Sequence, residues 1–127
     1  MTVAGRALVL DACLAITFGQ QQRLKLITDS SRRIVIGGRA RQEVKRPPAK
    51  TELDGALRSG HVDIETIDLE DPEEQEALAR YDAMPAFRDR GDAEVIALAV
   101  TRGYIVGSDD QAIRKQVRDD LGQSRIA

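Results

Sequence analysis

The sequence is poor in cysteine, histidine and aromatic residues. Its 127 residues include one cysteine, one histidine, two tyrosines, two phenylalanines and no tryptophan. A single cysteine excludes an internal disulfide and is typical of a reducing, cytoplasmic environment. With so few aromatic side chains, we expect a core built mainly from Leu, Ile, Val and Ala.

Long apolar stretches are also missing. No apolar run approaches the ~20 residues that a membrane-spanning helix needs. The apolar patch near the N-terminus is interrupted by Asp11, which makes it a poor secretory signal. The length predicts one domain over residues 1–127, with a core of its own. Without a long apolar run, we expect no membrane contact.

Charge is nearly balanced in total but unevenly distributed. The formal net charge is −2, yet residues 32–50 carry seven bases and one acid, and residues 63–76 carry eight acids and no base. A basic segment in a neutral protein can bind phosphates. Two solvated surface faces remain the plainer interpretation of charge alone.

Strand-like and helix-like segments alternate along the chain, which predicts an α/β fold with a mainly parallel sheet between helical layers. Asp71 followed by Pro72 predicts a helix start, and Thr51 is the expected N-cap of an earlier helix. The expected strands are 6–12, 33–36, 61–69, 104–108 and a final edge strand at 124–127. The expected helices are 13–27, 39–46, 51–60, 71–84, 93–103 and 109–122.

Acidic residues follow the strand ends, where the functional sites of open α/β sheets lie. Carboxylates that converge there require a counter-charge, and oxygen ligands favour Mg²⁺ or Mn²⁺. The converging positions are Asp11 after the first strand, Glu43 after the second, Asp92 at a helix start, and Ser108, Asp109 and Asp110 after the strand 104–108.

Four motifs occur in one order: LVLDACLAI, RQEV, GDAEVIALAV and VGSDDQAIRK. Together they resemble the PIN-domain family of metal-dependent ribonucleases, and more narrowly the toxin subunits of type II toxin–antitoxin pairs. The resemblance covers most of the chain. It implies a PIN-like three-layer α/β/α sandwich. It also implies the activity of a metal-dependent endonuclease that hydrolyses RNA phosphodiester bonds, with Mg²⁺ or Mn²⁺ as cofactor.

The resemblance also implies roles for individual residues. The catalytic set is Asp11, Glu43, Asp92 and Asp110. The metal ligands are Asp11, Asp92 and Asp110, with Asp109 as a neighbour. The substrate-binding residues are Ser108, Arg39, Arg41, Lys45 and Arg46.

The partners implied are an RNA substrate, an antitoxin that occludes the acidic site, and a second copy in a homodimer. Members of this family usually continue past the last helix into another strand. Here we expect the sheet edge near Ala127 to be trimmed or completed by a partner. The acidic segment 63–76 matches no motif of the family.

Other interpretations stay open. One alternative is a catalytically inactive PIN-like interaction module. Another is a receiver-like domain with Asp11 as phosphoacceptor, although the acidic pair and lysine of such domains are not in place. Asp11, Asp92 and Asp110 are also plausible turn or helix caps. Glu52 is an alternative to Glu43. Glu94 is a weaker candidate for the acidic site, because it lies about 200° around the helix from Asp92. Cys13 is expected to be a packing residue, and His61 a loop residue.

Overall fold

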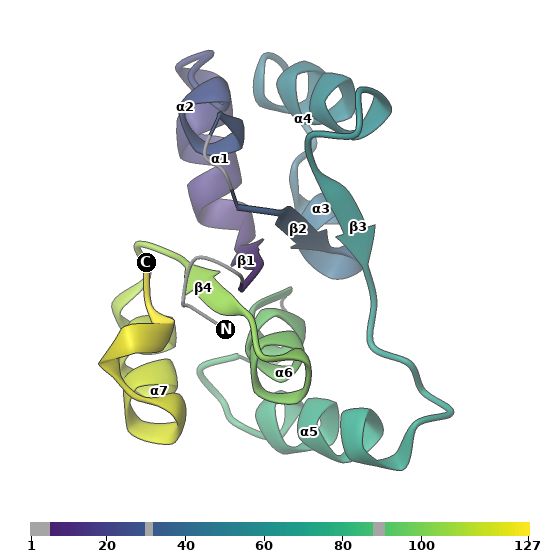
Figure 1. Cartoon of the computed structure of the whole chain (residues 1–127), viewed down its shortest axis with the longest axis vertical. Helices are drawn as coiled ribbons and strands as arrows, with labels where there is room; N and C mark the ends of the chain where they lie inside the picture. Colours follow the sequence, from purple (N-terminus) through teal and green to yellow (C-terminus); the bar gives the residue numbers. More distant parts are fainter. Residues whose placement is uncertain (1–5, 30–31, 88–90) are drawn as a thin grey trace.

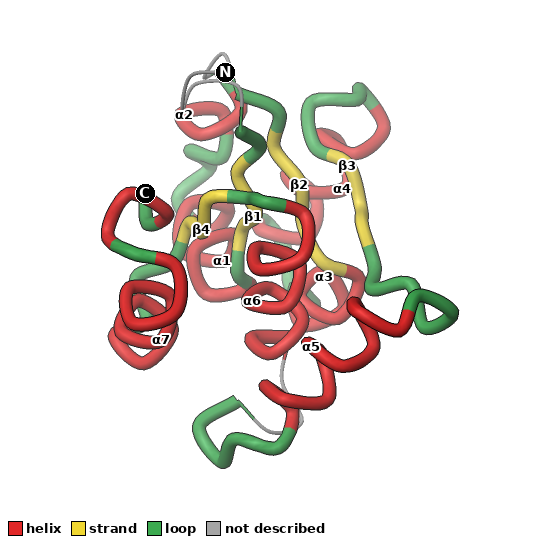
Figure 2. The backbone as a smooth tube through the Cα atoms, turned by 60° about the horizontal axis from the view of Figure 1, so that its bottom comes forward, coloured by secondary structure: helices red, strands yellow, loops and turns green. Residues whose placement is uncertain are grey.

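Four short strands form one sheet at the centre of the protein. The computed structural model describes residues 6–29, 32–87 and 91–127. All strand pairs are parallel, and the strand order is β3-β2-β1-β4 (Figure 2). The strands are β1 (Leu8–Leu10), β2 (Ile34–Gly37), β3 (Asp63–Glu65) and β4 (Ile105–Gly107).

Helices lie on both faces of this sheet, so the predicted three-layer α/β/α architecture is confirmed. In Figure 1, α1, α2 and α4 lie on one side of the strands, and α5, α6 and α7 lie on the other. The helices are α1 (Ala12–Gln20), α2 (Lys25–Thr28), α3 (Gly38–Glu43), α4 (Ala49–Arg58), α5 (Pro72–Asp82), α6 (Gly91–Arg102) and α7 (Gln111–Leu121). Among the described residues, no helix is both long enough and apolar enough to cross a membrane.

The core is built mainly from aliphatic residues and alanine, as the composition predicts. Every residue from Gly91 to Ala99 in α6 is buried, and α6 packs against β1, β2 and β4. Two aromatic side chains, Tyr81 and Phe87, are also buried. The Tyr81 hydroxyl donates a hydrogen bond to Oδ2 of Asp120 at 2.6 Å, which ties α5 to α7.

Several predicted element ends were wrong. The expected helix 13–27 is divided, because the chain turns between α1 and α2 with Gln22 at a φ of 56°. Thr51 is not an N-cap, since α4 begins at Ala49 and Thr51 lies inside it. The helix expected over 39–46 ends at Glu43. The start of α5 is confirmed: the Asp71 side chain accepts from the backbone N–H of Glu73 and Glu74.

The final segment is not the predicted edge strand 124–127. Residues Gln123–Arg125 form a 3₁₀ turn, and Ile126 then makes a single parallel bridge with Val106. The backbone N–H of Ala127 donates to the carbonyl of Val106 at 2.9 Å. A fifth strand is therefore begun beside β4 without forming a full ladder.

The acidic segment 63–76 has a structural role that its composition did not suggest. The guanidinium of Arg102, at the end of α6, donates to the carboxylates of Glu65 and Glu74 and to the carbonyl of Thr66. The Tyr104 hydroxyl also donates to Glu65, at 2.6 Å. These bonds hold the connection between β3 and α5 against the end of α6, so part of the negative charge is neutralised within the fold.

Candidate functional site

The ends of two neighbouring strands, β1 and β4, are joined by side chains. Since all four strands are parallel, their carboxyl ends share one edge of the sheet. Asp11 follows β1 and Ser108 follows β4. The Ser108 hydroxyl donates to Oδ2 of Asp11 at 2.5 Å and accepts from the backbone N–H of Asp110 at 3.0 Å. Ser108 therefore links Asp11, 97 positions earlier in the sequence, to the backbone of Asp110.

Asp11 is an acid without any exposed surface. Its Oδ1 accepts from the backbone N–H of Leu14 at 2.8 Å, so Asp11 also caps α1. Burial raises the pKa of its carboxyl, the hydrogen bonds from Ser108 and Leu14 lower it, and the charges of Asp110 and Asp109 raise it again. The net pKa is above the ordinary value, because burial disfavours the charged form. Such a group is stabilised by a positive charge.

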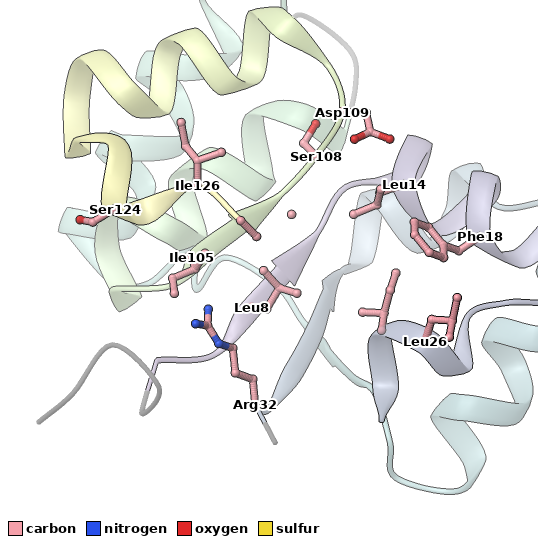
Figure 3. Close-up of a pocket in the computed structure, with 13 residues that line it drawn as sticks. Leu8, Leu14, Phe18, Leu26, Arg32, Ile105, Ser108, Asp109, Ser124 and Ile126 are labelled. Carbon is pink, nitrogen blue, oxygen red and sulfur yellow. The ribbon is translucent and has the colours of Figure 1, made fainter. Parts of the chain in front are cut away.

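Asp110 and Asp109 have different surroundings. Asp110 is the N-cap of α7, where its Oδ1 accepts from the N–H of Ala112 at 2.8 Å and of Ile113 at 3.3 Å. The capping role that the sequence left open for Asp110 is thus present. Asp109 is exposed. Figure 3 shows its carboxylate beside Ser108 at one end of a mostly apolar groove of about 480 Å³, which extends over Leu8 and Ile105.

The start of α6 abuts α3. Oε1 of Glu43 accepts from the backbone N–H of Gly91 at 3.0 Å. A Cβ at Gly91 would lie 2.8 Å from the backbone nitrogen of Ala40, so this close approach requires glycine. Asp92 follows in the first turn of α6 and is 7% exposed. Glu43 and Asp92 therefore lie on the two sides of the contact between α3 and α6.

Cys13 lies in the first turn of α1, within range of the charges of the four predicted catalytic acids. Partial desolvation raises the pKa of the Cys13 thiol, and the charges of Asp11, Asp92, Asp110 and Glu43 raise it further. The prediction that Cys13 is a packing residue was wrong, since it is exposed in the first turn of α1. Cysteine as a residue type does not predict this exposed position. The only signal in the sequence is that Cys13 comes two residues after Asp11.

The acids provide hard oxygen donors that suit Mg²⁺ or Mn²⁺ in chemical type. In residues 6–29, 32–87 and 91–127, no three carboxylate, thiol or imidazole side chains are arranged to hold a metal ion together. The carboxylates of Asp11, Glu43 and Asp110 instead accept hydrogen bonds from the protein. Metal binding would require these side chains to exchange such bonds for the cation.

The predicted substrate-binding cations fall into two pairs. Arg39 forms a bidentate ion pair with Asp82, with distances of 2.9 and 3.2 Å. Arg41 lies 3.4 Å from Asp54. Lys45 and Arg46 are exposed, and their side chains have no ion pair or hydrogen bond with any residue that the structure describes. Lys45 and Arg46 are thus the more available cations near Glu43.

Glu94 lies on another side of α6 from Asp92, as its helical spacing suggests. It is 4% exposed, and its Oε1 accepts from the backbone N–H of Arg39 at 2.9 Å. A Cβ at Gly37 would lie 2.7 Å from the same oxygen. Glu94 therefore caps the start of α3 at the end of β2. His61, expected in a loop, is exposed beside Ser59.

No protein-family model matches this chain, and no curated protein matches it. The resemblance to the PIN-domain family stays a prediction that rests on the four motifs and their order.

Proposed function

We propose that this protein is a divalent-metal-dependent endoribonuclease that hydrolyses RNA phosphodiester bonds. The observation that carries the proposal is the hydrogen-bonded link from Asp11 through Ser108 to Asp110 at the carboxyl ends of β1 and β4, together with the bond between Glu43 and the start of α6, next to Asp92. These acids come from four segments that are distant in sequence. Carboxylates placed at the carboxyl edge of a parallel sheet concentrate negative charge where a cation is favoured.

Asp11, Asp92 and Asp110 would hold the cation, with Asp109 beside them and Glu43 on the α3 side. A divalent cation bound there supplies Lewis-acid chemistry for phosphodiester hydrolysis, by lowering the pKa of water and offsetting negative charge. Ser108 orients the Asp11 carboxylate through its hydroxyl. The burial of Asp11 excludes water from that carboxylate and strengthens its interaction with a cation.

Lys45 and Arg46 would contact the RNA backbone, because Arg39 and Arg41 are engaged with Asp82 and Asp54. Phosphate contacts of this type position a nucleic acid without reading its sequence. The acidic residues at this edge would also suit the proposed partner, an antitoxin that inserts a basic residue among the carboxylates. A homodimer belongs to the same proposal.

The first test is cleavage of a mixed RNA substrate by purified protein with Mg²⁺, with Mn²⁺ and with EDTA. Asp11→Asn is the test variant, and Asp119→Asn, an exposed acid of α7, is the matched control. We expect metal-dependent cleavage by the wild type and the control, and a loss of at least about 100-fold in Asp11→Asn. Equal cleavage by wild type and Asp11→Asn, or no cleavage in any metal, would favour the inactive interaction module.

Metal binding can be measured without RNA. A ligand that binds only the folded state stabilises it, by about 2.7 kcal/mol at 100 times its dissociation constant. We expect Mn²⁺ to raise the melting temperature of the wild type and of Asp119→Asn, but not of Asp11→Asn. A shift of the same size in all three proteins would place the bound cation elsewhere.

A further inference from the structure

A small cavity adjoins the candidate site on the side of Glu43. It has a volume of about 200 Å³, below the roughly 300–1,000 Å³ of pockets that hold drug-sized ligands. Its walls come from α1 and from the chain between α3 and α4. A cavity of this size can take one planar ring system and exclude a complete nucleotide.

The lining of this cavity combines three kinds of group. Ile16, Val44 and Ala49 form the apolar part, and Val44 and Ala49 are buried. The side-chain amide of Gln20, at the end of α1, supplies two donors and one acceptor. That amide is exposed and has no hydrogen-bond partner among the described residues. Apolar surfaces suit the faces of a base, and an amide suits its edge.

Charge at the rim connects the cavity to the acidic site. Glu43 lines the cavity and also accepts a hydrogen bond from the backbone N–H of Gly91, next to Asp92. Lys45 and Arg46 line it too, and no described residue pairs with their side chains. A phosphate held by these cations would lie between the cavity and the acids. Arginine can also stack its guanidinium plane on a base, which matters because no aromatic residue lines the cavity.

We propose that this cavity binds one unpaired nucleobase of the RNA, next to the phosphate that is cleaved, and that Gln20 reads the edge of that base. The inference rests on the proposed ribonuclease function and adds to it a base-binding cavity and a specificity-determining residue. The RNA must be single-stranded at this position, because a paired and stacked base cannot present its edge to Gln20. Lys45 and Arg46 contribute affinity, and Gln20 contributes selectivity.

The test is cleavage of a random-sequence single-stranded RNA pool, followed by sequencing of the product ends. The variants are Gln20→Ala and Gln42→Ala; Gln42 lines the neighbouring cavity on the other side of Val44 and is the matched control. We expect the wild type and Gln42→Ala to prefer one base at a fixed position beside the cut by about fivefold or more. In Gln20→Ala this preference falls below about twofold. A preference that Gln20→Ala leaves unchanged, or a wild type with no preference, overturns the inference and leaves the nuclease function standing.

Binding separates this inference from the nuclease proposal. Asp11→Asn and Asp11→Asn/Gln20→Ala are titrated in Mg²⁺ with labelled single-stranded RNA heptamers that differ only in their central base. We expect one heptamer to bind Asp11→Asn about fivefold more tightly than the others, and this difference to vanish in the double variant. Arg46→Ala in the same background should weaken all heptamers equally. Selectivity retained without Gln20 overturns the inference. Absence of cleavage together with Gln20-dependent selectivity overturns only the nuclease proposal.

Discussion

The hydroxyl of Ser108 donates to the fully buried carboxylate of Asp11 at 2.5 Å, across 97 positions of sequence. The bond joins the carboxyl ends of β1 and β4, a central strand and its neighbour at the edge of the sheet. It also lowers the pKa of Asp11 against the effect of burial. Ser108 is therefore a positioning residue for the acid that we expect to matter most.

Ser108→Ala should destabilise the protein by about 1–3 kcal/mol at neutral pH, because a buried charged acceptor loses a donor. Urea unfolding at pH 7 measures this loss, with Ser124→Ala as the exposed control. In an Asp11→Asn background the same substitution should cost much less. Equal costs in the two backgrounds would show that Ser108 does not act through Asp11.

Asp11→Asn should be at least as stable as the wild type at pH 7 in the presence of EDTA. The folded-state pKa of Asp11 is raised, so the folded state binds more protons than the unfolded state between the two pKa values. The stability of the wild type is then highest below the unfolded-state pKa and is lost as pH rises through the folded-state pKa. The advantage of Asp11→Asn should accordingly shrink from pH 7 towards pH 4.

Urea unfolding midpoints at several pH values give this comparison, and Asp119→Asn provides the baseline for an exposed acid. A wild type that is clearly more stable than Asp11→Asn at pH 7 without metal would show that the hydrogen bonds to Asp11 outweigh its burial.

Gly91→Ala should destabilise the protein by about 1–3 kcal/mol and reduce cleavage, because its Cβ would press on the backbone of Ala40. The contact holds the start of α6, with Asp92, against α3, with Glu43. Gly55→Ala is the control: it lies within α4 with open space around it, and alanine there should stabilise by about 0.5–1 kcal/mol. If Gly91→Ala keeps full stability and full cleavage, the α3–α6 contact does not position the site.

Tyr81→Phe should cost about 1–2 kcal/mol, since it removes a buried hydroxyl that donates to the carboxylate of Asp120. Burial raises the pKa of Asp120, but Tyr81, Gln116 and Arg80 lower it below the ordinary value. Stability from this group is present above the unfolded-state pKa and is lost as pH falls through the folded-state pKa. Thermal unfolding at pH 7 and pH 3 should show a smaller difference between Tyr81→Phe and wild type at pH 3.

Helix starts could be predicted where residues close in sequence determine them. Asp71 with Pro72 starts α5, and Asp110 caps α7, because short polar side chains satisfy the first N–H groups of a helix. Thr51 carried a similar signal and failed, since packing against α1 favours a helix that begins two residues earlier, at Ala49. The final segment reads as a strand by its residues, yet it pairs through one bridge only.

The sequence by itself determined the alternation of strands and helices, the aliphatic core, and the placement of Asp11, Ser108 and Asp110 after strands. These features depend on hydrophobic period and on residues close in the chain. The pairing of Arg39 and Arg41 with Asp82 and Asp54, the bond from Ser108 to Asp11 and the position of Gln20 in a cavity beside Glu43 depend on the tertiary structure. Such contacts join residues that are distant in sequence, and their distances are set by how helices pack on the sheet.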